Sequence, residues 1–111
     1  MRHFLIGWRP SGKARNAAPY IEIISRFTSG QISASEFEAA YIALFSSETK
    51  LLPKVVATPI NEVFYDIDDY VSDPELRAEM SGLDDEQLRE RVAVQLQLLV
   101  EAVESEGQQM G

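Results

Sequence analysis

The chain has 111 residues, 45% hydrophobic and 25% charged, which indicates one ordinary globular domain and excludes disorder along the whole length. Cysteine is absent, so disulfide bonds and thiolate zinc sites are excluded, and no apolar run is long enough for a membrane span or a signal peptide. The net charge of −8 is concentrated in residues 61–90, with eleven Asp/Glu against two Arg, which disfavours a direct nucleic-acid ligand there.

The first predicted helix follows an N-terminal segment, residues 1–16, that we expect to be loosely structured. Arg-Pro-Ser-Gly within that segment is typical of a turn, and the apolar run Phe4–Trp8 fits either a short strand or a segment docked on the core. Helical periodicity starts at Ala17, and Pro19 suits a first helical turn. Gly30 is placed as a C-terminal glycine.

The second predicted helix begins at a capping box, in which Ser33 is followed three residues later by Glu36. Its apolar face follows at helical spacing and comprises Phe37, Tyr41, Leu44 and Phe45. The stretch LLPKVVATP, residues 51–59, carries two prolines and a pair of valines. We interpret it as a connector that is extended in part.

The third predicted helix starts at Thr58 as N-cap with Pro59 in the first turn. Its apolar stripe comprises Ile60, Val63, Phe64, Ile67, Tyr70 and Val71. Asp73-Pro74 then starts a short helical turn that Ser81-Gly82 ends. A last helix begins at a second capping box, Asp84 to Gln87. Steps of three and four residues define its seam, which comprises Leu88, Val92, Leu96, Leu99 and Val103.

Four amphipathic segments joined by short links predict an all-α fold, an antiparallel four-helix bundle with a loosely structured N-terminal segment. The domain boundaries that follow are an N-terminal extension over residues 1–16, a helical bundle over residues 17–105 and a frayed tail over residues 106–111. We expect this bundle to be monomeric and cytoplasmic.

The third predicted helix carries a stripe of carboxylates. Glu62, Asp66, Asp69 and Asp73 are spaced by four, three and four residues, which places them on one helix face. Asp68 and Tyr65 lie on the shoulders, and Tyr70 adds a second aromatic side chain of the kind enriched at interfaces. The sequence leaves two interpretations open, a solvated face that keeps the protein soluble and a surface that binds a basic partner.

Catalytic and metal-binding patterns are not found in the sequence. The single histidine, His3, lies in the N-terminal segment, and no Glu-x-x-His pair, glycine-rich phosphate loop or nucleophile elbow occurs. We therefore expect no enzymatic activity, no catalytic residue, no cofactor and no metal site.

Several stretches together carry a resemblance to a known family: Gly30 to Glu38, Tyr41 to Phe45, Ile60 to Tyr70, Ser72 to Arg77 and Leu83 to Val92. The run from Phe64 through Leu76 is the most specific of them. Over about residues 20–100 the chain resembles the bacterial self-protective immunity family typified by the colicin D immunity protein, which includes immunity proteins of contact-dependent growth inhibition. The basic segment before Ala17 is not part of that pattern.

The resemblance implies an immunity protein that binds and neutralises a cognate nuclease toxin, one that cleaves transfer RNA in the case of colicin D. It implies that acidic side chains stand in for RNA phosphates and cover the basic active site of the toxin in a 1:1 complex. The toxin-binding residues that it implies are Glu62, Tyr65, Asp66, Asp68, Asp69 and Asp73. Two other classes remain open at this point, an acidic adaptor or nucleic-acid mimic for another basic protein, and an enzyme subunit whose carboxylates bind metal.

Overall fold

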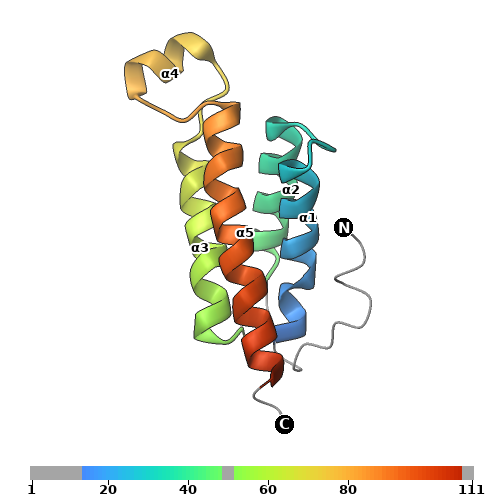
Figure 1. The fold of residues 1–111 in the computed structure, drawn as a ribbon. Coiled ribbons are helices and arrows are strands. Elements are labelled where there is room, and N and C mark those ends of the chain that lie inside the picture. The colour runs from blue at the N-terminus through green and yellow to red at the C-terminus, as the bar shows by residue number, and fades with distance from the viewer. Residues whose placement is uncertain (1–13, 49–51, 109–111) are drawn as a thin grey trace.

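The computed structural model describes residues 14–48 and 52–108, and within them it contains five α-helices and one short 3-10 helix. Figure 1 shows the four longer helices side by side and the short α4 beyond one end of them. The bounds are η2 Ala14–Ala17, α1 Ala18–Thr28, α2 Ala34–Ser46, α3 Lys54–Asp69, α4 Pro74–Met80 and α5 Asp85–Gln108. The predicted all-α fold is confirmed.

The expectation for the N-terminal segment concerns mainly residues 1–13, which lie outside the described residues. The last part of that segment forms η2, which leads directly into α1. Pro19 occupies the first turn of α1 as predicted, where its missing N–H leaves no hydrogen bond unmade. After the C-cap at Ser29, Gly30 adopts φ of 85°, a left-handed conformation that glycine reaches without a Cβ clash.

Both predicted capping boxes are present. The Ser33 hydroxyl accepts from the Glu36 N–H at 3.1 Å, and the Glu36 carboxylate accepts from the Ser33 N–H at 2.8 Å. At the start of α5, Asp84 and Gln87 exchange the same pair of hydrogen bonds at 2.8 and 3.0 Å. Each box satisfies two backbone N–H groups that the first helical turn leaves without a partner.

The predicted start of α3 is wrong. The helix begins at Lys54 with Pro53 as its N-cap, so the two valines expected to be extended are helical and Pro59 lies inside the helix. Proline cannot donate to the carbonyl group four residues earlier, and an interior proline commonly costs about 3 kcal/mol. Burial of the Pro59 ring together with Val56 offsets this cost.

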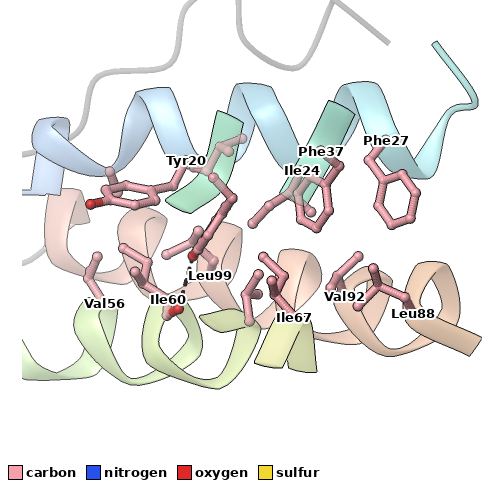
Figure 2. Packing of buried hydrophobic residues seen from close by; sticks show 14 of the residues in the cluster. Tyr20, Ile24, Phe27, Phe37, Val56, Ile60, Ile67, Leu88, Val92 and Leu99 are labelled. Atoms are coloured by element: carbon pink, nitrogen blue, oxygen red, sulfur yellow. Dashed lines mark hydrogen bonds between the residues drawn. The ribbon is translucent and has the colours of Figure 1, made fainter. Parts of the chain in front are cut away.

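The core lies where α1 and α3 pack against α5 and where α2 packs against α1 and α3. Figure 2 shows buried side chains from α1, α2, α3 and α5 facing one another there. The rings of Phe27 and Phe37 stack at a centroid distance of 4.4 Å. The Tyr41 hydroxyl, buried in the same core, donates to the Ile60 carbonyl oxygen at 2.9 Å. Of the predicted α5 seam, Leu96 is only half-buried and the other four residues are fully buried.

The segment containing α4 leaves the end of α3 and returns to the start of α5 at one point. The Val71 N–H donates to the Leu83 carbonyl oxygen at 3.1 Å, and the Leu83 N–H donates to the Asp69 carbonyl oxygen at 2.8 Å. These two bonds form a neck beside the bridge between Tyr70 and Leu83, which is the only β-pairing in residues 14–48 and 52–108. Gly82 fits this neck because a Cβ there would lie 2.5 Å from Val71 Cγ2.

Candidate functional site

Four of the predicted toxin-binding side chains lie exposed on one side of α3. Glu62, Tyr65 and Asp69 follow one another at three- and four-residue steps, so they share a helix face. Asp68 is exposed on the shoulder of that face, three residues after Tyr65. We name these four residues the α3 acidic face. Tyr65 lies at the centre of this face and is 58% exposed. Its ring meets the ring of the half-buried Phe64 edge-on at a centroid distance of 6.2 Å.

Asp66 departs from the expected exposed stripe. Its exposed fraction is 6%, and its carboxylate accepts a hydrogen bond at 3.2 Å from Nη1 of Arg91, which α5 contributes. Desolvation by burial raises the pKa of Asp66, and the lowering effect of Arg91 does not fully offset it. Glu62 and Asp69 on the same helix raise this pKa further. The structure therefore places Asp66 at the seam between α3 and α5.

Asp73 also departs from the helical stripe, because α3 ends at Asp69 and the chain is extended at Tyr70. The Asp73 side chain is the N-cap of α4, where Oδ1 accepts from the N–H groups of Glu75 at 2.9 Å and Leu76 at 3.3 Å. It remains exposed and lies a few residues beyond the neck. Asp73 thus extends the acidic region to α4 instead of continuing the α3 acidic face.

Tyr70 does not accompany Tyr65 on the surface. It is 7% exposed, and its hydroxyl donates to Asp85 Oδ1 at 2.7 Å. Burial, with the neighbouring Asp85 carboxylate, raises the pKa of Tyr70 to about 12. The hydroxyl consequently holds the start of α5 against the end of α3 and is not available to a partner.

Further acidic side chains lie at the same end of the molecule. Glu75 and Glu79 are exposed on α4, and Asp85 and Glu86 are exposed in the first turn of α5. The cations in this region are engaged within the chain. Arg91 bonds Asp66, and Arg89 bonds Glu86 at 3.2 Å while its guanidinium lies 4.8 Å above the Phe27 ring. The region therefore favours a positively charged partner.

The sequence does not reveal two features of this region. Arg91 lies 25 residues from Asp66, and the spacing within α3 contains no signal for this pair. The exposed apolar pair of α4, Leu76 and Met80, is visible in the sequence at a spacing of four residues. Only the structure shows that this pair faces away from the core.

Other kinds of site have little support in the described residues. Within residues 14–48 and 52–108, no three potential metal-ligating side chains converge. An open hollow of about 450 Å³ between α3 and α5 is lined mainly by apolar atoms, and its residues are Val55, Thr58, Pro59, Leu98, Glu101 and Ala102. A lone carboxylate in a shallow apolar hollow is not a constellation for acid–base or nucleophilic catalysis.

Fold and surface together define a small all-helical protein with exposed carboxylates on α3, on α4 and in the first turn of α5. Residues 17–99 match the family model described as bacterial self-protective colicin-like immunity. The match spans most of the chain, so the protein belongs to this family. No curated protein and no solved structure matches it.

Membership gives the protein a general role: it is a self-protective immunity protein that binds a cognate toxin. Proteins of this kind are typically inhibitors without enzymatic activity. In the part of the chain that the structure describes, none of the helices combines the length and hydrophobicity needed to cross a bilayer.

Proposed function

We propose that the toxin is a nuclease, and that this protein neutralises it by covering the basic active site with the α3 acidic face. The observation that carries the proposal is the exposed row Glu62, Tyr65 and Asp69, with no lysine or arginine between them in the sequence. A site that binds nucleic-acid phosphates is rich in arginine and lysine, and carboxylates at helical spacing can pair with such groups.

Within this proposal the substrate of the toxin is transfer RNA, as the resemblance to the colicin D immunity protein implies. The protein acts in the cytoplasm as a monomer and forms a 1:1 complex. Contact-dependent growth inhibition and a secreted bacteriocin are both compatible sources of the toxin. We also interpret α1, α2, α3 and α5 as the antiparallel four-helix bundle that the sequence favours, with α4 outside it; the contacts of α5 with α1 and α3 support this interpretation.

Tyr65 is the expected energetic anchor on α3. An exposed aromatic ring gains free energy when it is desolvated at the centre of an interface, whereas carboxylates at the rim mainly speed association. Asp66 contributes differently, because Arg91 already occupies its carboxylate. We propose that Asp66 positions α3 against α5 and contributes to toxin binding by keeping Arg91 paired.

A charge-reversal experiment tests the proposed surface. Glu62→Lys with Asp69→Lys changes two exposed residues, whereas Asp66→Lys would bury a cation beside Arg91 and disturb the fold. The matched control reverses Glu101 and Glu104, which are exposed on α5. The ligand is the cognate toxin domain, identified by its co-purification with the tagged chain from its own cells. The readouts are growth on co-expression and cleavage of purified transfer RNA.

The wild-type chain and the Glu101/Glu104 control should restore growth and block cleavage at equimolar ratio. The Glu62/Asp69 variant should lose protection and bind at least tenfold more weakly. A folded Glu62/Asp69 variant that protects like the wild type would overturn the assigned surface. A cognate toxin domain that leaves transfer RNA and other nucleic acids intact would overturn the nuclease assignment.

A further inference from the structure

The short helix α4 carries exposed apolar side chains outside the core. None of its seven residues is buried, and Figure 1 shows the helix beyond the end of the four longer ones. Leu76 is 45% exposed and Met80 is 62% exposed. A spacing of four residues places both on one helix face. The excursion therefore presents an apolar pair to solvent without contributing to the hydrophobic core.

The surroundings of this apolar pair are acidic. Glu75 and Glu79, one residue before each member of the pair, are exposed. The only cation of α4, Arg77, is directed back at the neck, where its Nε donates to the Val71 carbonyl oxygen at 2.9 Å. Its Nη2 donates to the Ser72 carbonyl oxygen at 3.3 Å. The apolar pair is thus bordered by carboxylates on its own helix.

The orientation of α4 is fixed by hydrogen bonds instead of core packing. A helix of seven residues is marginal in water by itself. Here Asp73 caps its start, and at its end the Gly82 N–H donates to the Arg77 carbonyl oxygen at 3.1 Å. The two bonds of the neck, between Val71 and Leu83 and between Leu83 and Asp69, close the excursion. Because the helix is already formed in the free chain, binding does not have to offset the conformational entropy that is lost when a helix forms.

We propose that α4 is a second, apolar anchor of the toxin complex beside Tyr65: Leu76 and Met80 enter an apolar pocket on the toxin domain that is bordered by lysine or arginine. This inference rests on the proposed function and adds a second contact element to it. Charge complementarity selects the occupant, because the carboxylates around the pair disfavour an acidic partner or a second copy of this chain. Methionine adapts to irregular apolar pockets, which suits an anchor of this kind.

The two contact elements have different kinetic roles. Charges of the α3 acidic face act over a distance and raise the association rate constant, whereas a desolvated apolar anchor slows dissociation. A change confined to α4 should therefore alter dissociation and leave association and its salt dependence nearly constant.

The test compares two matched double variants of the full chain. Leu76→Ser with Met80→Ser removes the apolar pair of α4. Val94→Ser with Leu98→Ser removes a pair with the same spacing on α5, where the exposed fractions are 58% and 47%. Surface plasmon resonance with the same co-purified toxin domain gives the association and dissociation rate constants, and circular dichroism gives the melting temperature.

For the α4 variant we expect dissociation at least tenfold faster than wild type, with association within about twofold and an unchanged melting temperature. The α5 variant should match the wild type in its dissociation rate constant, its association rate constant and its melting temperature. If the α4 variant melts at a lower temperature, Met80→Ser alone repeats the comparison at the more exposed position.

If the α4 variant dissociated as slowly as the wild type, the inference would be overturned. The proposed function would remain intact, because the wild-type chain would still bind and protect. An equal increase of the dissociation rate constant in the α4 and α5 variants would also overturn the inference, since the effect would then not be specific to α4. A wild-type chain that fails to bind the toxin domain is a different outcome, which overturns the proposed function and the anchor together.

Discussion

Asp66 is held at the edge of the α3 acidic face with only 6% of its surface exposed. Two opposing effects act on its carboxyl group: burial raises its pKa, and the hydrogen bond and charge of Arg91 lower it, with burial the larger effect. Arg91 itself is half-exposed, so solvent screens the pair and weakens the compensation. The ionised carboxylate therefore costs folding free energy, because burial removes the water that would otherwise solvate it.

The raised pKa fixes the sign of a pH dependence. The folded state holds the Asp66 proton more tightly than the unfolded chain, where the pKa is about 3.9. The stabilising contribution of this group is therefore fully present below about pH 4 and is lost as the pH rises through the raised folded-state pKa.

Asp66→Asn removes this titration, so we expect its free energy of unfolding to equal or exceed that of the wild type at pH 7. The advantage should shrink as the pH falls toward 4, because the wild-type carboxyl group binds its proton more readily in the folded state than in the unfolded chain. Urea unfolding at pH 4, 5.5 and 7 measures the difference, with Asp68→Asn as the exposed control. A loss above about 1 kcal/mol at pH 7, the size of a typical hydrogen bond, would show that the pairing with Arg91 outweighs the desolvation.

At the scale of the helices, the sequence predicts the features that depend on residues close together in the chain and misses those that depend on packing between distant segments. Capping boxes at Ser33 and Asp84 depend on side chains three residues apart, so the sequence contains all of the information. The sequence does not contain the start of α3 in the same way, because the tolerance of the interior Pro59 depends on the burial of its ring in the folded chain. The same limit applies to the site: spacing predicted the shared face of Glu62 and Asp69, but the burial of Asp66 depends on where α5 packs.

The neck of the α4 excursion depends on the absence of a side chain at position 82. An added Cβ would lie 2.5 Å from Val71 Cγ2 and 3.0 Å from the Asp69 carbonyl oxygen, which itself accepts the Leu83 N–H. Gly82→Ala must displace one side of the neck. We expect it to lower the free energy of unfolding by about 1–3 kcal/mol, the usual cost of overpacking.

Hydrogen exchange locates this effect, since the amides of Val71 and Leu83 should exchange faster in Gly82→Ala while amides in the middle of α5 lose protection only through the global change. Ala78→Ser, an exposed change within α4, is the control and should leave both amides protected. Unchanged exchange at the Leu83 amide would mean that the neck accommodates a methyl group without opening.

At the scale of the whole molecule, charge is distributed unevenly. Residues 61–90 carry eleven of the 18 acidic side chains and two of the ten Lys/Arg, a local net charge of −9 in a chain whose total is −8. Most of these carboxylates lie on α3, α4 and the start of α5, which meet at the neck. A field of this kind orients a basic partner before contact and raises the rate of productive encounters.

Salt should therefore slow the association of the toxin domain without much effect on dissociation. The Debye length falls from about 10 Å at 0.1 M to about 3 Å at 1 M. Added salt therefore screens the long-range attraction between the two charged surfaces while they approach each other. Between 0.05 and 0.5 M NaCl we expect the association rate constant to fall by at least about tenfold and the dissociation rate constant to change by less than about threefold. Stopped-flow fluorescence, with Trp8 replaced and a dye on the toxin domain, measures both rate constants.

Glu62→Lys with Asp69→Lys should flatten the salt dependence, and the Glu101/Glu104 reversal should flatten it much less, because those residues lie outside the charged 61–90 region. An association rate constant that is independent of salt in the wild type would show that shape and apolar contact alone guide the encounter.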